Sequence, residues 1–285
     1  MKFLNYSQDG QNGLAVSDGA GYKGLLASDP GFPGTLQQLV TQGAGAFEKA
    51  ASALKKGQAI DLEKIRYLPP FETPGKIFCI GLNYADHSAE SGFELPTYPA
   101  IFSRFTSSMM GHGQPLVRPR VSEKLDYEGE LVAVIGRAGK YIRKEDALAH
   151  VAGYSICNDG SVRDYQMKSA QWTIGKNFDN TGGFGPFFVT ADELPPGADG
   201  LQLTTRLNGV VVQNASTSSL IFNVATLVSL LSEAVMLQPG DVIVTGTPAG
   251  VGLARKPPLF MKHGDICEVE IEGIGTLRNP VVDEA

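Results

Sequence analysis

The sequence has few cysteines, and their arrangement argues against two kinds of stabilisation. Cys79, Cys157 and Cys267 lie far apart in a chain of 285 residues, and no two of them form a C-x-x-C pair. An odd number of scattered cysteines does not make a disulfide framework, and zinc sites built from thiolates usually need close pairs. We therefore expect each cysteine to be buried as a small apolar residue.

Long apolar runs and a surplus of positive charge are also absent. No stretch of 18 apolar residues occurs, and 24 Lys and Arg residues stand against 30 Asp and Glu residues, a formal net charge of −6. A membrane-spanning helix needs such a run, and a nucleic-acid surface usually needs such a surplus. The first ten residues lack the apolar stretch of a secretory signal. We therefore expect a cytoplasmic protein that binds neither membranes nor nucleic acid.

The remaining composition is that of a globular protein in two parts. Hydrophobic residues make up 42% and charged residues 19% of the chain, which allows a sizeable core without metal or disulfide staples. Residues 1–68 alternate short strand patterns with turns and contain one predicted helix at 35–56. Residues 69–75 are rich in proline and indicate a linker. Residues 76–285 form the second, larger part.

The larger part contains many short apolar runs bounded by glycine and proline. Helices are predicted only around 84–91, 144–150 and 223–232. Strands and helices do not alternate as they do in a doubly wound sheet. We therefore predict an α+β, strand-rich fold, a mixed β-sandwich roll with a few helices, beside a small N-terminal α/β unit.

Three acids stand two residues apart where a buried strand begins. In Asp126-Tyr-Glu128-Gly-Glu130 the carboxylates share one face, because alternate residues of a strand point the same way. The residues that follow are apolar on both faces, so the acids lie at the border of the core. Packed and buried carboxylates repel one another and need compensation, which a hard divalent cation supplies most directly. The alternative is a solvated strand face, which Glu-x-Glu alone does not exclude.

Asp159 is a candidate third ligand, since it follows the apolar strand at 151–157 and precedes a glycine. Ligands that are all carboxylate oxygens favour Mg²⁺, Mn²⁺ or Ca²⁺ over zinc. An acid before glycine is also common in an Asx-turn, which is the alternative interpretation.

His87 and Glu90 are candidates for acid–base chemistry. They stand three residues apart in a predicted helix and can therefore form a hydrogen bond. A carboxylate on one imidazole nitrogen fixes the tautomer and raises the basicity of the other nitrogen. This pair could activate water, and the alternative is a surface His–Glu pair.

Several other polar residues could contact a substrate. Lys176, in a short apolar run broken by glycine, could hold a carboxylate or stabilise an enolate, or it could be an ordinary lysine. Arg163 and Gln166 would share a face of a short helix, and a polar helix start is the alternative. The loop 245–252 lacks the Gly-Lys-Ser/Thr of a nucleotide-binding loop. We expect its backbone N–H groups and the Thr247 hydroxyl to approach a small anionic ligand.

Seven segments of the larger part, taken in their order along the chain, resemble the fumarylacetoacetate hydrolase family. Each motif alone is weak, but the ordered set is specific and covers nearly all of residues 76–282. The matching segments are KIFCIGLNYADHSAE, PAIFSRFTSS, LDYEGELVAVIG, GYSICNDGSVRDYQ, QWTIGKNFDNTGGFGP, LQPGDVIVTGTPAGVG and HGDICEVEIEGIGTLRNPV.

The resemblance implies a β-roll catalytic domain over residues 76–285 and a homodimer. It implies Mg²⁺ or Mn²⁺, with Ca²⁺ as a substitute in crystals, at the positions that match Glu128, Glu130 and Asp159. It also implies a His–Glu dyad on a mobile lid helix, at His87 and Glu90.

The resemblance assigns further positions to the substrate site. The lysine of the family's Gly-Lys motif matches Lys176, and Arg163, Gln166 and Thr247 match positions that line the site. Many members have a lysine where this chain has Arg104. Because arginine binds carboxylates bidentately whereas lysine acts as a point charge, we expect Arg104 to change the substrate contacts.

The activity implied is metal-dependent hydrolysis of a C–C bond in a small acylpyruvate or 1,3-diketo acid, with His87 activating the water. Decarboxylation of oxaloacetate-like acids or isomerisation of 2-hydroxydienoates would use the same residues and stays an open alternative. A non-catalytic ligand-binding protein would have no need of the dyad, so this third class is disfavoured.

Overall fold

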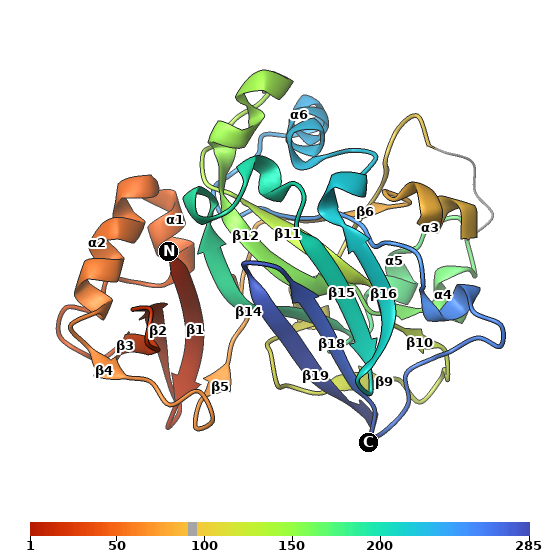
Figure 1. Cartoon of the computed structure of the whole chain (residues 1–285), viewed down its shortest axis with the longest axis horizontal. Coiled ribbons are helices and arrows are strands. Elements are labelled where there is room, and N and C mark those ends of the chain that lie inside the picture. The colour runs from red at the N-terminus through yellow and green to blue at the C-terminus, as the bar shows by residue number, and fades with distance from the viewer. Residues whose placement is uncertain (91–95) are drawn as a thin grey trace.

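The computed structural model describes residues 1–90 and 96–285, and most of its strands join one large mixed sheet (Figure 1). Across this sheet run β4 (Gln58–Ala59), β3 (Tyr22–Leu26), β2 (Gln11–Ser17), β1 (Lys2–Gln8), β14 (Gly182–Thr190), β12 (Val151–Asn158), β11 (Gly129–Ile135), β17 (Val242–Val244), β6 (Ile77–Gly81) and β7 (Ala100–Ser103). Two short strands, β5 (Arg66–Tyr67) and β8 (Met109–Met110), pair with β1 and β14. β17 and β6 are parallel, whereas β11 is antiparallel to both of its neighbours. The predicted strand-rich α+β fold is confirmed.

A second sheet packs in front of the first (Figure 1). Its strands are, in order, β16 (Val210–Ser216), β15 (Gln202–Leu207), β18 (Ile266–Ile271), β19 (Gly275–Asp283) and β9 (Leu116–Arg118). The short strands β10 (Leu125–Asp126) and β13 (Ser161–Val162) form a separate antiparallel pair. The two sheets bury one core between them, which includes Leu131 of β11, Leu203 of β15 and Val269 of β18.

Strand β11 is buried on both faces, as its sequence predicts. Leu131 and Ala133 belong to the core between the sheets, whereas Val132 and Val134 belong to a core on the other side of the large sheet. All seven residues of the strand are buried. A strand held on both faces is a rigid support, and the candidate acids lie at its N-terminal end.

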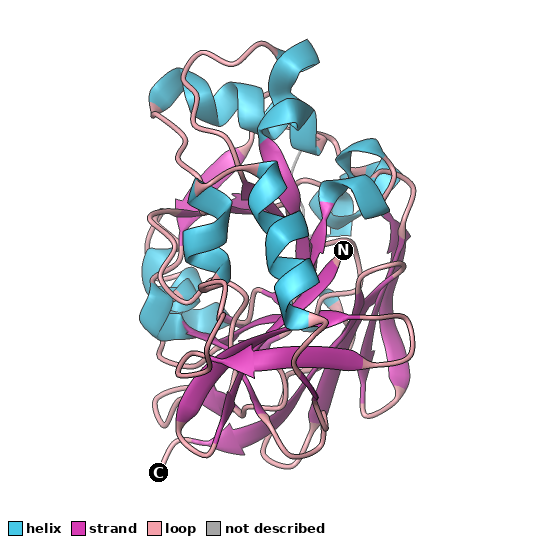
Figure 2. Cartoon of the chain, turned by 90° about the vertical axis from the view of Figure 1, so that its left-hand side faces the viewer, coloured by secondary structure: helices cyan, strands magenta, loops and turns pink. Residues whose placement is uncertain are grey.

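The N-terminal residues extend the large sheet, and their helices cover one of its faces (Figure 2). Strand β1 pairs with β14, and Phe3 packs against Phe188 in a shared core. The proline-rich segment is attached to β1, because the Asn5 amide donates hydrogen bonds to the carbonyls of Pro69 and Pro70. The domain boundaries at residues 68 and 76 stay a prediction, although the two parts share a sheet and a core.

The helix predicted at 35–56 is wrong in one respect, because it is two helices. α1 (Leu36–Thr41) begins at Thr35, whose hydroxyl accepts from the Gln38 backbone N–H in a capping box. α2 (Ala44–Leu54) begins after Gly43, whose φ of 87° lies in the left-handed region. Glycine adopts that conformation easily, so the chain turns there instead of continuing as one helix.

Two of the three helices predicted in the larger part are α-helices. They are α3 (Ala85–Glu90) and α6 (Val224–Ala234). The predicted end of the first at Ser91 lies outside the described residues. The third, at Lys144–His150, is a 3₁₀-helix. Two further short helices, α4 (Arg163–Gln166) and α5 (Thr173–Lys176), follow the candidate ligand Asp159.

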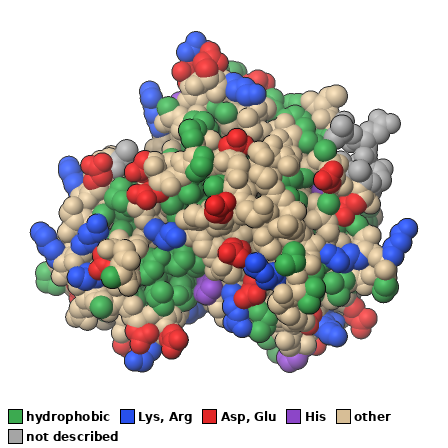
Figure 3. Space-filling view, in the orientation of Figure 1, with side chains coloured by type: hydrophobic (Ala, Val, Ile, Leu, Met, Phe, Trp, Pro, Cys, Tyr) green, Lys and Arg blue, Asp and Glu red, His purple; other side chains and the backbone are tan. Residues whose placement is uncertain are grey.

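Two observations on the described residues concern the expected partners. Within residues 1–90 and 96–285, no helix is long and apolar enough to cross a membrane. Acidic and basic side chains are interspersed over the face seen in Figure 3. The expectation that the protein binds neither membranes nor nucleic acid stays a prediction.

Candidate active site

The three predicted ligand carboxylates lie together at one end of β11 and β12. One carboxylate oxygen of each of Glu128, Glu130 and Asp159 lies within 4.8 Å of the others, and all three residues are buried. The antiparallel register explains this, because Glu130 stands opposite Cys157 and the Asp159 backbone N–H donates to the Glu128 carbonyl at 2.8 Å. The acids are therefore positioned by the backbone of two buried strands.

Two buried cations neutralise part of this cluster. Lys176 Nζ lies 2.5 Å from Glu128 Oε2 and 2.7 Å from Asp159 Oδ2, and Arg163 Nη2 lies 2.7 Å from Glu128 Oε1. Burial alone would raise the pKa of Glu128, but Lys176 and Arg163 outweigh it and bring the pKa to about 2. Burial would likewise lower the pKa of Lys176, yet Asp159 and Glu128 raise it. Glu128, Lys176 and Arg163 are therefore charged at neutral pH.

Glu130 is the acid that lacks such compensation. Its Oε2 accepts a hydrogen bond from the Gly246 backbone N–H, and no Lys or Arg of the described residues forms an ion pair with it. Burial, followed by the charges of Asp159 and Glu128, raises its pKa well above the usual carboxyl range. The uncompensated oxygen-only cluster fits a hard divalent cation, which would supply the missing positive charge.

Arg104 lies behind the cluster and not on the cavity lining. Its side chain is fully buried, and Nη1 donates to Asp159 Oδ1 at 2.6 Å and to the Gly160 carbonyl at 2.9 Å. Nε and Nη2 donate to the hydroxyls of Ser108 and Thr181. The predicted substrate contact is thus not what the structure shows, because these neighbours occupy the guanidinium. Arg104 instead fixes one oxygen of Asp159.

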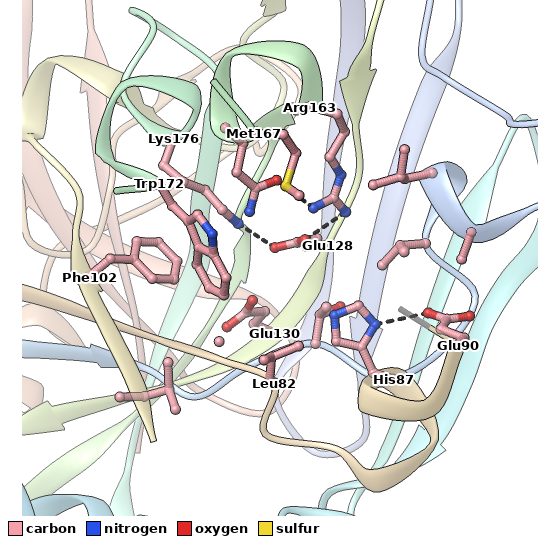
Figure 4. Close-up of a pocket in the computed structure, with 17 residues that line it drawn as sticks. Leu82, His87, Glu90, Phe102, Glu128, Glu130, Arg163, Met167, Trp172 and Lys176 are labelled. Carbon is pink, nitrogen blue, oxygen red and sulfur yellow. Dashed lines mark hydrogen bonds and ion pairs between the residues drawn. The ribbon is translucent and has the colours of Figure 1, made fainter. Parts of the chain in front are cut away.

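The predicted His–Glu pair faces the same cavity from α3 (Figure 4). His87 Nδ1 lies 2.9 Å from Glu90 Oε1, and His87 is only 7% exposed. The Gly250 backbone N–H donates to both oxygens of Glu90, at 3.0 and 2.9 Å. With Nδ1 protonated toward Glu90, Nε2 is left as an acceptor on the side of Glu128 and Glu130.

Sequence reasoning missed the residue that anchors this helix. Asn83 is fully buried, and its side-chain amide donates to the carbonyls of Phe222 and Thr245, at 2.9 and 2.7 Å. Its Oδ1 accepts from the Phe222 backbone N–H at 2.7 Å. A polar residue between a strand and a helix was the only signal. Asn83 fixes the turn from which α3 presents His87.

Asp126 also has a structural task that the sequence left open. Its carboxylate accepts from Arg163 Nε at 2.7 Å and from the backbone N–H groups of Gly252 and Leu253, at 2.8 and 2.9 Å. Arg163 Nη1 donates in turn to Gln166 Oε1 at 2.9 Å. Asp126 therefore orients Arg163 and one wall of the cavity, and it is not part of the carboxylate cluster.

Two backbone N–H groups of the loop after β17 contact carboxylates of the site. The N–H groups of Gly246 and Gly250 are donated to Glu130 and Glu90. The Thr247 hydroxyl lines the cavity, but its proton is donated to the Gly129 carbonyl at 3.0 Å. The loop thus orients carboxylates of the site.

The cavity has a volume of about 230 Å³ and one apolar side. Predicted residues on its lining are His87, Glu90, Glu128, Glu130, Arg163, Gln166, Lys176 and Thr247. The apolar side, which sequence reasoning missed, includes Leu82, Phe102, Met167, Trp172 and Leu253. These residues come from four separate segments, so no local pattern brings them together.

Comparison with known proteins agrees with this geometry. The sequence profile described as fumarylacetoacetate (FAA) hydrolase C-terminal matches residues 76–282. A mitochondrial oxaloacetate tautomerase of Xenopus laevis is 42% identical over 273 residues, which are 95% of this chain and 85% of that protein. Its compartment does not support the expected cytoplasmic location, which stays a prediction.

Two solved structures are similar over the whole chain. A fumarylacetoacetate hydrolase from Exiguobacterium antarcticum superposes with a TM-score of 0.87 at 36% identity, and each chain is covered completely. A 5-carboxymethyl-2-hydroxymuconate delta-isomerase from Mycobacterium smegmatis has a TM-score of 0.78 at 31% identity, again with complete coverage of both. The profile match, the sequence identity and the shared fold agree: this chain belongs to the fumarylacetoacetate hydrolase family.

Proposed function

We propose that this chain is a divalent-metal-dependent tautomerase or isomerase of small 2-oxo acids. One observation carries the proposal: a buried carboxylate cluster and a His–Glu dyad face the same small cavity. Keto–enol conversion needs a polarised 2-oxo group and a base at the neighbouring carbon. The names of the frog oxaloacetate tautomerase and the mycobacterial isomerase point the same way.

Glu128, Glu130 and Asp159 would hold the metal, which we take to be Mg²⁺ or Mn²⁺ because every ligand is a carboxylate oxygen. When bound, the cation would polarise the 2-oxo group of the substrate and lower the cost of forming its enolate. The fit is supported by Glu130, which is buried and forms no ion pair with a Lys or Arg of the described residues, so a cation would supply its missing partner.

His87 would move the proton. Its neutral Nε2 takes a proton from the substrate carbon next to the 2-oxo group, and Glu90 stabilises the imidazolium that forms. The proton then returns to the 2-oxygen to give the enol, or to a different carbon to give an isomer. Lys176 and Arg163 keep Glu128 ionised, while Gln166 and Thr247 offer polar contacts from the lining.

Hydrolysis of a C–C bond, the reaction expected first from the sequence, is the second candidate. It is favoured by the same dyad, since a base held by a carboxylate could also activate water. Decarboxylation of an oxaloacetate-like acid needs no water but uses the same polarised 2-oxo group. The names of the similar proteins give less support to hydrolysis than to tautomerisation or isomerisation.

The test follows the ultraviolet absorbance of the enol forms of oxaloacetate and phenylpyruvate after enzyme is added with Mg²⁺, with Mn²⁺ or with EDTA. Release of pyruvate and of CO₂ is measured in the same samples and with an acylpyruvate. Loss of enol without either product supports tautomerisation, pyruvate with CO₂ indicates decarboxylation, and pyruvate from the acylpyruvate without CO₂ indicates hydrolysis. Activity that is insensitive both to EDTA and to His87→Gln would overturn the proposal.

A further inference from the structure

Two packed aromatic rings form a wall on the apolar side of the cavity. The rings of Phe102 and Trp172 meet edge to face, with centroids 5.7 Å apart and an interplanar angle of 68°. The indole lies directly on Gly81, where an added Cβ would come within 2.3 Å of it. Both rings face the cavity (Figure 4). Since Gly81 leaves room for the indole, the wall is fixed by packing and presents an apolar surface to a ligand.

The arginine and lysine side chains on the described lining already form ion pairs with buried acids. Arg163 is paired with Asp126 and Glu128, and Lys176 with Glu128 and Asp159, all within 2.7 Å. Neither positive charge is therefore available to pair with a second anionic group of a ligand.

Neighbouring cations point elsewhere. Lys168 Nζ lies 3.4 Å from the centroid of the Tyr165 ring, and Arg255 donates to the carbonyls of Gly250 and Val212. Neither Lys168 nor Arg255 is on the described lining. The segment 91–95 reads Ser-Gly-Phe-Glu-Leu and contains no Lys, Arg or His.

The charges of the site leave no surplus positive charge for a second carboxylate. Four buried acids (Asp126, Glu128, Glu130 and Asp159) and Glu90 on the lining stand against the three buried cations Arg104, Arg163 and Lys176. A divalent cation would cancel this excess of two negative charges, and the carboxylate beside the 2-oxo group would lie next to that cation. A second carboxylate would remain unpaired near Glu90.

We infer that the substrate is a 2-oxo acid with a single carboxylate and an apolar, preferably aromatic, distal group packed on Phe102 and Trp172. The inference rests on the proposed function and names the substrate class of that site. The volume of 230 Å³ allows it, because a cavity of about 150 Å³ already holds benzene. Oxaloacetate, which ends in a second carboxylate, is then a poor fit.

The experiment compares two non-reactive mimics of a 2-oxo acid that differ only at the distal end. N-benzyloxamate ends in a phenyl group, and N-oxalylglycine ends in a carboxylate. Their dissociation constants are measured by calorimetry on the full chain with saturating Mg²⁺. We expect N-benzyloxamate to bind at least about tenfold more tightly, since apolar pockets discriminate on that scale.

A charge at the cavity mouth should shift this preference. Met167 is 61% exposed and lines the cavity, whereas Ile174 is 62% exposed and does not. Met167→Arg should reduce the ratio of the two dissociation constants by about tenfold, because it offers the missing cation. Ile174→Arg, the matched control with the same added charge, should leave the ratio unchanged.

The outcomes separate the inference from the proposed function. If N-oxalylglycine binds as tightly as N-benzyloxamate, or if both arginine variants change the ratio equally, the apolar-substrate inference is wrong and the proposed function stands. If neither mimic binds in the presence of Mg²⁺, the 2-oxo acid site itself is wrong and both fall. Tighter binding of N-benzyloxamate, shifted by Met167→Arg alone, supports the inference.

Discussion

A substitution of Arg104 tests whether this residue supports Asp159 or contacts the substrate. The sequence predicted a substrate contact, whereas the structure shows Arg104 paired with Asp159 away from the cavity lining. Its ion pair with Asp159 has a length of 2.6 Å, and neither side chain is exposed. Replacing Arg104 with methionine would leave the Asp159 carboxylate without this partner in the protein interior. Removing one member of a buried pair costs about 3–5 kcal/mol of unfolding free energy.

A second ion pair of the same length provides the control. Arg118 lies 2.6 Å from Asp283, but the two side chains are 23% and 47% exposed. Water screens this pair, so Arg118→Met should cost at most about 1 kcal/mol. The two pairs have the same length and the same charged groups, so the comparison measures the cost of burial together with the further buried acceptors of Arg104.

The assay is urea unfolding of the wild type and of both methionine variants, together with Arg104→Lys. The lysine variant keeps the charge but cannot reach all of the guanidinium's acceptors, Asp159, Gly160, Ser108 and Thr181. It should lose about 1–3 kcal/mol, and it keeps the test informative if Arg104→Met does not fold. Should Arg104→Lys retain wild-type stability while KM alone rises, Arg104 contacts the substrate and the structural assignment is wrong.

Three further predictions address the dyad, the metal cluster and the assembly. His87→Gln should lower kcat by about 10²–10⁴ while calorimetry shows Mg²⁺ binding retained, because His87 is not a ligand; loss of Mg²⁺ binding would refute this assignment. Without metal, the raised pKa of Glu130 means that its contribution to stability is present below the unfolded value of 4.5 and is lost as pH rises through the folded pKa. Thermal melts should therefore show a stabilisation by Mg²⁺ that grows as pH rises above about 4.5, and a shift of equal size at every pH would contradict it. The homodimer is proposed from the family resemblance, and light scattering that finds a monomer at micromolar concentration would exclude it.

The sequence allowed prediction of those parts of the site that local patterns encode. The alternation around Glu128 and Glu130 placed both acids on one face of β11, and the apolar residues on both faces of that strand predicted its complete burial. The i, i+3 spacing of His87 and Glu90 predicted their contact. In each case the geometry of one strand or one helix turn is enough, because the partners are close in sequence.

Contacts between distant segments could not be predicted in this way. Phe102 and Trp172 meet only because the segment before α5 folds back over β7, and Gly81 makes room for the indole from a third segment. Arg104 and Asp159 are 55 residues apart, and nothing near Arg104 shows that its partner is a buried acid. A pairing of this kind depends on the register of the whole sheet.

The loop 245–253 shows how the chain resolves the main conflict of this site, which is the burial of several acids together. It donates backbone N–H groups to three carboxylates of two separate segments. Gly246 donates to Glu130 and Gly252 to Asp126, whereas Gly250 donates to Glu90 on α3. Backbone donors add no side-chain charge and are held in place by the fold. They can therefore orient an acid without competing for a metal or a substrate.

The glycines of this loop are a consequence of the same arrangement. Gly246 and Gly250 have φ values of 105° and 104°, which other residues adopt only with strain. An added Cβ at Gly250 would lie 2.1 Å from the Val212 carbonyl oxygen, and one at Gly252 would lie 1.9 Å from the Leu259 carbonyl oxygen. The loop must therefore run close to neighbouring backbone in order to reach the carboxylates. Because this one loop contacts the carboxylate cluster, the dyad and Asp126, which supports Arg163, we expect a substitution that displaces the loop to disturb all three.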